Sequence, residues 1–169
     1  MSKTMEPTQL DLEQKLSGLL PLYGHRNWIV VADAAYPAQS KPGIETIVAD
    51  ADQIETVRKV ADAIRASKHI RANVYTDREL GFVEEIDAPG IADYRRQLGA
   101  TLYGSHVLEL AHEQIIAKLD QSAQVFRILI IKTDMTIPYT SVFFELDCGY
   151  WSAEAEERLR QTMLVADSK

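Results

Sequence analysis

The sequence predicts an α/β protein, with a single domain in which a mainly parallel β-sheet is flanked by helices. Two observations support this fold class. Short apolar runs alternate along the chain with longer segments in which apolar residues recur every three or four positions. Trp28–Ala32 is apolar at every position, as expected of a strand buried on both faces of a parallel sheet. At 169 residues, the chain has the length of one domain with a sizeable core.

The first elements are a helix, a strand and a loop. Leucines at roughly helical spacing predict a helix that ends at Pro21: Leu10, Leu12, Leu16, Leu19 and Leu20. After the strand Trp28–Ala32, the Pro- and Gly-containing residues 34–43 predict a loop at its C-terminal edge. Loops at that edge usually carry function in α/β proteins. A second short strand is expected at Ile44–Val48.

The middle of the chain continues the alternation. Asp52 can cap a helix, with Glu55 three residues later as its partner. One face of this helix is apolar: Ile54, Val57, Ala61 and Ile64. Residues 72–75 alternate in polarity and predict a strand, whereas the acidic residues 84–87 predict a solvated loop.

Two further helices are predicted after this loop. Pro89 suits the first turn of a helix that runs through Leu98, and Gly99 is expected to close it in the left-handed conformation. A short strand at residues 107–110 follows. Beyond it, apolar residues recur at spacings of 3 or 4 and predict one long helix. They are Ile116, Leu119, Ala123, Phe126 and Ile130.

The C-terminal part predicts a last strand at residues 142–144 and a final helix. Ser152 can cap this helix, which carries apolar residues along one side: Ala155, Leu159 and Met163. We therefore expect a flexible N-terminus over residues 1–9, one domain over residues 10–150 and a helical extension over residues 151–169.

The composition narrows the class of partner. A net charge of -7 and a pI of about 5.1 argue against nucleic acid and anionic membranes, which need a basic surface. Cys148 is the only cysteine, so no disulfide can form within one chain. The N-terminal residues lack the apolar run of a signal peptide, and no stretch is long enough to span a bilayer. We expect a cytoplasmic protein that binds a small neutral ligand or another protein.

Few residues remain as candidates for chemistry, because the sequence lacks a Gly-rich phosphate loop, a metal-binding histidine pair and a Gly-x-Ser-x-Gly elbow. The candidates near strand ends are His25, Asp33, His112, Tyr139 and Ser141. Asp33 follows a buried strand, where open α/β sheets bind ligands, although an Asp there can equally cap a turn. His25 also suits an exposed loop, His112 a plain helix start and Tyr139 packing at a rim.

Taken in order, these residues resemble the D-ribose pyranase and L-fucose mutarotase family (RbsD/FucU) over residues 19–149. The most specific block, residues 24–38, is similar to the family's Gly-His, apolar strand and Asp-Ala-x-x-Pro. Residues 89–98 resemble the fucose branch, and residues 112–114 resemble a His-Glu-Gln of the ribose branch. Residues 133–141 stand where the family has Thr-Gly-Glu and then Tyr-x-Asn.

The resemblance implies a mutarotase or pyranase that interconverts anomers or ring forms of an aldose such as L-fucose or D-ribose, without a cofactor or a metal. It implies His25 as the general acid and the other four candidates as contacts to the monosaccharide: Asp33, His112, Tyr139 and Ser141. It also implies a ring-shaped homo-oligomer, such as a decamer.

Several residues depart from the family pattern. Asn27 replaces a usual Asp, Asp134 and Met135 replace Gly-Glu, and Ser141 replaces an Asn whose amide has two donors and a longer reach. These changes leave open a non-catalytic sugar-binding or regulatory module on the same fold. The acidic loop and the C-terminal helix leave open a third alternative, a structural assembly protein without a small ligand.

The spacing of His25 and Asp33 poses a geometric problem. About six strand residues at roughly 3.3 Å each would hold the two side chains about 20 Å apart in one chain, which is too far for one sugar to bridge. We therefore expect the working site to lie between subunits, with His25 of one chain close to Asp33, His112 and Tyr139 of its neighbour.

Overall fold

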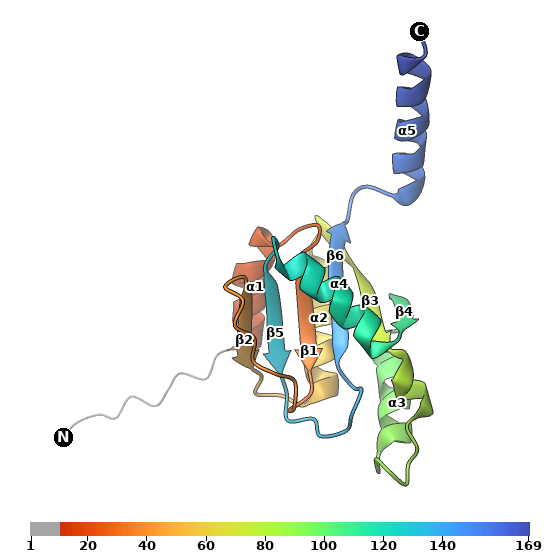
Figure 1. Ribbon diagram of the computed structural model, residues 1–169. Coiled ribbons are helices and arrows are strands. Elements are labelled where there is room, and N and C mark those ends of the chain that lie inside the picture. Colours follow the sequence, from red (N-terminus) through yellow and green to blue (C-terminus); the bar gives the residue numbers. More distant parts are fainter. Residues whose placement is uncertain (1–10) are drawn as a thin grey trace, which may run out of the picture.

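A computed structural model describes residues 11–169; the predicted flexible segment 1–9 and Leu10 lie outside this range. Figure 1 shows one sheet with helices packed against it and a last helix that projects from the body. The helices are α1 (Leu12–Leu19), α2 (Gln53–Ala66), α3 (Ile91–Thr101), α4 (His112–Ala123) and α5 (Ala153–Asp167). The strands are β1 (Trp28–Ala32), β2 (Ile44–Val48), β3 (Ile70–Asp77), β4 (His106–Leu110), β5 (Ile128–Lys132) and β6 (Val142–Cys148). Two 3-10 turns are η1 (Leu20–Leu22) and η2 (Arg78–Phe82).

The six strands form one sheet in the order β2-β5-β1-β6-β3-β4. The pairs β2 with β5, β5 with β1, and β3 with β4 are parallel, which confirms the predicted mainly parallel sheet. Only β6 runs the other way, and it pairs antiparallel with β1 on one side and with β3 on the other. The start of β6 therefore lies at the edge of the sheet where β1 and β3 end.

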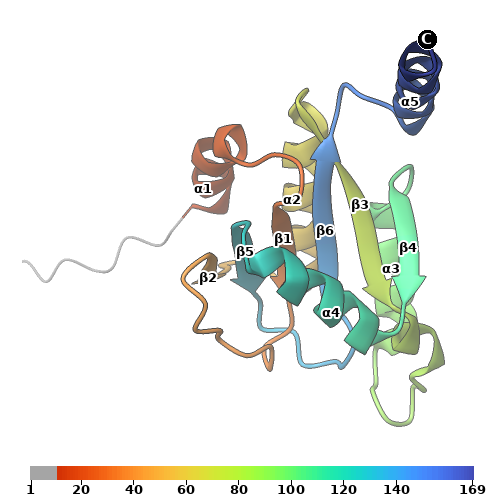
Figure 2. The same cartoon turned by 45° about the horizontal axis from the view of Figure 1, so that its top comes forward.

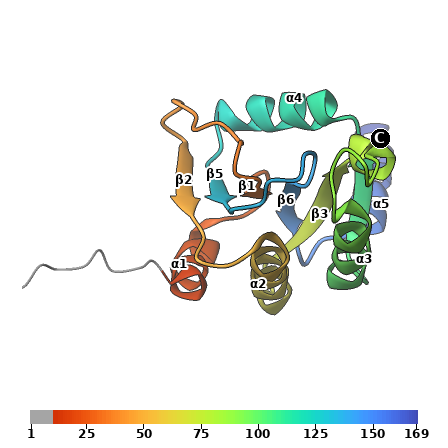
Figure 3. The same cartoon turned by 90° about the horizontal axis from the view of Figure 1, so that it is seen from below.

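Helices cover both faces of the sheet. Figure 3 shows α1, α2 and α3 below one face and α4 alone across the other. The side chains of β1 alternate between these layers: Ile29 and Val31 pack with α1–α3, whereas Trp28, Val30 and Ala32 pack under α4. All five are completely buried. Burying one such apolar side chain contributes roughly 1.5–3 kcal/mol, so β1 is a rigid support for the residues at its two ends.

The long helix predicted after residue 112 is wrong in its second half. The helix α4 ends at Ala123, and Ile128–Lys132 forms strand β5 between β1 and β2. The side chains from Ile128 to Ile131 are completely buried, on alternating faces of the sheet. Phe126 and Ile130 continue the helical spacing of apolar residues only by coincidence. The largely β-branched run that begins at residue 128 favours a strand and was the better indication of the structure.

The prediction for Gly99 is also wrong. The helix α3 begins at Ile91 after Gly90, continues through Gly99 and ends at Thr101. Gly104 has the left-handed backbone (φ 81°), three residues past the end of the helix. The Asp52 cap is confirmed, because its carboxylate accepts from the Glu55 N–H at 2.8 Å.

The C-terminal helix α5 stands apart from the sheet and its covering helices (Figures 1 and 2). Ser152 caps it as predicted, and its hydroxyl accepts from the Ala155 N–H at 3.0 Å. No residue of α5 is buried, and Leu159 and Met163 are exposed. Among the described residues, no helix combines the length and the apolar character that a membrane span needs.

Candidate active site

Two of the predicted residues meet where β1 ends and β6 begins. Asp33 directly follows β1, and Ser141 directly precedes the antiparallel β6. The Asp33 N–H donates to the Ser141 hydroxyl at 3.1 Å. Because the serine oxygen accepts this bond, its own proton remains free to be donated to a ligand. Sheet topology thus brings together residues that are more than 100 positions apart in the sequence.

His112 and Tyr139 meet at the same edge. Their rings contact edge-on, with centroids 5.9 Å apart, and Tyr139 is 40% exposed. The backbone of Tyr139 has φ 59°, in the left-handed region that only a few per cent of residues other than glycine occupy. Such strained positions gather at ligand sites, where surrounding structure holds them in place.

The sequence analysis missed the partner of His112. Asp77 is the last residue of β3, its side chain is only 1% exposed, and its carboxylate lies 2.9 and 3.0 Å from His112 Nδ1. Nδ1 therefore donates to Asp77, which leaves Nε2 as the free ring nitrogen. Glu79 in η2 also accepts from the His112 N–H, at 3.0 and 3.1 Å, and so fixes the start of α4.

Burial shifts the acidity of the groups at this site. It raises the pKa of Asp33 above its ordinary value, against the opposing effect of the Tyr36 and Ala35 N–H groups. Burial also raises the pKa of Asp77, and the hydrogen bond with His112 opposes the shift. It raises the pKa of Tyr36 to about 12, so this phenol stays protonated at neutral pH.

These side chains line a pocket of about 360 Å³, at the small end of the range of ligand sites in proteins. Four of the five candidates contribute to it: Asp33, His112, Tyr139 and Ser141. The remaining wall comes from the loop after β1, with Tyr36, Pro37 and Gln39, and from α4, with Glu113 and Ile116. The arrangement offers hydroxyl, carboxyl and imidazole groups on an apolar floor, which suits a small polyhydroxylated molecule.

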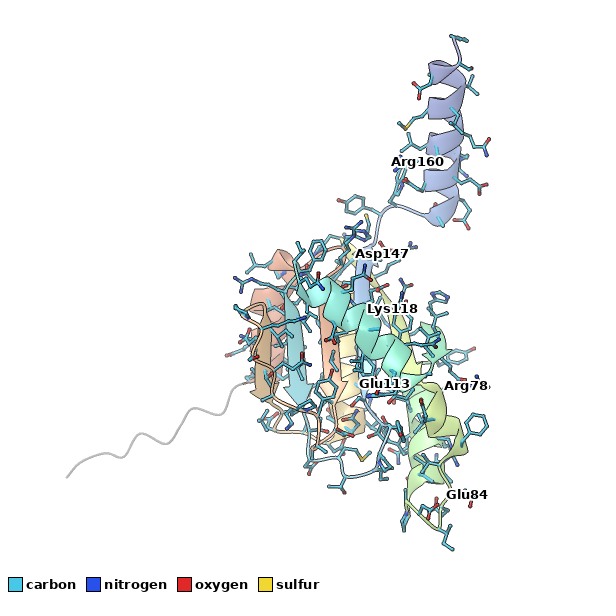
Figure 4. All side chains as sticks on the ribbon, viewed as in Figure 1. Arg78, Glu84, Glu113, Lys118, Asp147 and Arg160 are labelled. Carbon is cyan, nitrogen blue, oxygen red and sulfur yellow. The ribbon has the colours of Figure 1, made fainter. Side chains whose placement is uncertain are left out.

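The fifth candidate lies elsewhere. His25 precedes β1, so the whole strand separates it from Asp33. Its Nδ1 lies 2.8 Å from Asp147 Oδ1 at the end of β6, and Arg26 Nε donates to its Nε2 at 3.2 Å. A second, larger pocket of about 640 Å³ includes His25, Asp147 and Lys118. Figure 4 shows Asp147 apart from Glu113, which lines the Asp33 pocket, with Lys118 of α4 between them.

Within residues 11–169, no three His, Cys, Asp or Glu side chains are grouped as metal ligands. The pairs His112–Asp77 and His25–Asp147 are suited to hold and move protons. The residues that complete these pairs lie beyond the predicted ends of their strands: Asp77 is the last residue of β3, and Asp147 is the last but one of β6. Asp77 lies on the same sheet face as Tyr75, two positions earlier, and Asp147 on the same face as Phe143, four positions earlier.

Three solved structures have the same fold. Bacillus subtilis RbsD complexed with D-ribose matches with TM-score 0.53 and 17% identity, covering 85% of this chain and 98% of that one. Streptococcus pneumoniae fucose mutarotase in complex with L-fucose matches with TM-score 0.50 and 20% identity, covering 85% and 97%. FucU from Bifidobacterium longum matches with TM-score 0.53 and 15% identity, covering 84% and 98%.

Sequence comparison gives a family but no individual curated relative. No curated protein sequence matches this chain significantly. The model of the RbsD / FucU transport protein family matches residues 5–148, which include both pockets and exclude α5. The resemblance seen in the sequence motifs is therefore confirmed: the chain belongs to the RbsD/FucU family.

Proposed function

We propose that this chain is a sugar mutarotase or pyranase that works without a cofactor on an aldose such as L-fucose or D-ribose. The observation that carries the proposal is the gathering of Asp33, His112, Tyr139 and Ser141 around one small pocket. Membership of the RbsD/FucU family supports it. The sugars named for the B. subtilis and S. pneumoniae relatives indicate the ligand class.

The chemistry needs only proton transfer. In ring opening, the anomeric hydroxyl loses a proton, its electron pair forms the carbonyl, and the bond from the anomeric carbon to the ring oxygen breaks. The ring oxygen then takes up a proton, and closure on either face reverses the steps. A histidine can accept the first proton and deliver it to the ring oxygen. We assign this role to His25, with Asp33, His112, Tyr139 and Ser141 holding the sugar hydroxyls.

We further propose that the working site forms between two copies of the chain. Each chain carries two half-sites, one at each end of β1: the Asp33 pocket and the His25 pocket. A ring of subunits would place the His25 half-site of one chain on the Asp33 half-site of the next, in a repeated head-to-tail contact. This contact would also bury His25, whose side chain is 57% exposed in the single chain.

Exchange proton NMR provides the direct test. L-fucose, D-ribose and D-galactose would be incubated with the wild-type chain, and exchange between anomers or ring forms would be measured. We expect accelerated exchange for at least one sugar and a loss of about 100-fold or more in His25→Ala. The matched control is His106→Ala, which removes another exposed histidine that lines neither pocket and should keep the wild-type rate.

The outcomes separate the functional alternatives. If the wild-type chain binds a sugar but does not accelerate its exchange, the proposed enzyme is refuted and the non-catalytic sugar-binding module is favoured. Equal losses in His25→Ala and His106→Ala would remove His25 from the mechanism.

A further inference from the structure

The His25 half-site contains an acidic partner that comes from the far end of the chain. Asp147 lies at the end of β6, and its Oδ1 lies 2.8 Å from His25 Nδ1. The nearby Asn27 does not serve this role, because its side chain accepts from the Gly24 N–H and donates to the Arg127 carbonyl. Asn27 therefore closes the turn that carries His25, and Asp147 supplies the acceptor for the ring.

Asp147 is itself held in place at both carboxylate oxygens. Oδ1 also accepts from the Cys148 N–H at 2.7 Å, and Oδ2 accepts from Arg71 on β3 at 3.2 Å. Burial acts to raise the pKa of Asp147, but the bonds from Cys148, Arg71 and His25 outweigh it and leave the pKa below its usual value. The group is thus an ionised acceptor at neutral pH, and His25 Nδ1 must be the donor.

The contact on the other ring nitrogen agrees with this assignment. Arg26 Nε donates to His25 Nε2 at 3.2 Å, so Nε2 carries a lone pair and no proton. Arg26 has a left-handed backbone (φ 74°) and lies over the Phe126 ring at 5.6 Å, which holds its guanidinium beside the imidazole. A sugar hydroxyl that approaches Nε2 would take the place of the Arg26 contact.

We propose that Asp147 is the positioning residue for His25: it fixes the Nδ1–H tautomer and leaves Nε2 as the atom that exchanges protons with the sugar. This inference rests on the proposed mutarotase function. In the reaction, Nε2 takes the proton of the anomeric hydroxyl as the carbonyl forms and the ring bond breaks. Asp147 faces the imidazolium that results, and the same proton passes from Nε2 to the ring oxygen.

A purely structural role for this pair is disfavoured by its exposure. Asp147 and His25 are both accessible to solvent, and exposed ion pairs contribute little to stability. Chains with a substitution at Asp147 should therefore still fold, so that a change in the His25 tautomer or in the rate can be assigned to the lost contact.

The experiment compares three variants of the full chain: Asp147→Ala, Asp147→Asn and Arg71→Gln. The first removes the acceptor, the second keeps an oxygen but removes the charge, and the third breaks only the ion pair on Oδ2. Long-range proton–nitrogen NMR of the His25 ring, without sugar, reports the tautomer. Sugar-exchange NMR at several sugar concentrations separates kcat from KM.

We expect the wild-type ring to be the Nδ1–H tautomer and Asp147→Ala to change it to the Nε2–H form that solvated imidazole prefers. The kcat of Asp147→Ala should fall at least about 10-fold, with KM within about twofold, since Asp147 acts through His25. Asp147→Asn should be intermediate, and Arg71→Gln should keep the wild-type tautomer and about half or more of kcat.

Two results would overturn the inference: a wild-type ring protonated on Nε2, or an Asp147→Ala chain with the wild-type tautomer and rate. A wild-type chain that accelerates no sugar exchange would instead refute the proposed function. The tautomer measurement, which needs no sugar, would then still decide whether Asp147 positions His25.

Discussion

The two ends of β1 carry different kinds of half-site. At the Asp33 end, the acidic partner of the histidine is almost completely buried, and two loops, the end of β3 and the start of α4 converge on the pocket. At the His25 end, the histidine and its carboxylate are both solvent-accessible, and the pocket is larger. The fold of one chain organises the first half-site. In the proposed assembly, the second half-site would become shielded from water only when a neighbouring chain covers it.

The strongest test of this division is complementation between inactive chains. His25→Ala and Asp33→Asn would be co-expressed and allowed to assemble. If each working site takes His25 from one chain and Asp33 from another, about a quarter of the sites will be intact, and activity will rise from near zero to about a quarter of the wild-type level. The measurement is sugar-exchange NMR at equal protein concentration.

The control for complementation uses the wild-type chain mixed with the double variant His25→Ala/Asp33→Asn. A site between chains gives about a quarter of full activity in this mixture too, whereas a site within one chain gives about half. A mixture of the single variants that stays inactive, together with half activity in the control, would place the reaction within one chain.

A smaller effect is expected from the buried carboxyl of the Asp33 half-site. Asp77→Asn removes the charge that orients His112, and we expect sugar exchange to slow by about 10-fold. The folded-state pKa of Asp77 is raised, so the folded chain binds this proton more tightly than the unfolded chain. As pH rises from about 4 through the raised pKa, Asp77 therefore contributes progressively less to the free energy of unfolding.

Urea titrations at several pH values between 4 and 6 measure this contribution. The free energy of unfolding of the wild type, minus that of Asp77→Asn, should decrease with rising pH. An increase over that range would mean that the His112 contact, and not burial, controls the acidity of Asp77.

The smallest effect is expected at α5. Because no residue of this helix is buried, truncation after Tyr150 should leave the melting temperature within about 2 °C of the full chain. Thermal unfolding at low protein concentration checks this expectation. A drop of 5 °C or more would show that α5 packs against the domain or against another copy in solution.

The sequence was sufficient for the fold class and for most elements because apolar periodicity and caps are local signals. Trp28–Ala32 and the Asp52 cap were both assigned correctly. The β5 strand was mistaken for helix because its identity depends on pairing with β1 and β2, which are distant in the sequence. The helix end predicted at Gly99 was wrong because tertiary packing outweighs the low helix propensity of glycine there. Leu98 and Leu102, on either side of Gly99, are both buried, and α3 continues to Thr101.

The candidate site was predictable in part. The candidates Asp33, His112, Tyr139 and Ser141 came from their places near predicted strand ends, and the family resemblance implied their roles. Sheet topology explains why they meet. Asp77 and Asp147 were missed because each is a polar residue at the end of a strand and is recognisable only once the opposite histidine is placed. The alternation of side chains along a strand predicts which face of the sheet such a residue lies on, but not which residue it contacts.

The antiparallel strand β6 runs from one half-site to the other. β6 begins one residue after Ser141 at one pocket and ends one residue after Asp147 at the other. A slip in its register against β1 and β3 would therefore displace both groups at once. In the assembly that we propose, β6 would thus set the distance between consecutive active centres. Under the proposed function, we expect substrate preference to diverge in parts that β6 does not hold in place, such as residues 34–43 and the exposed turns of α4.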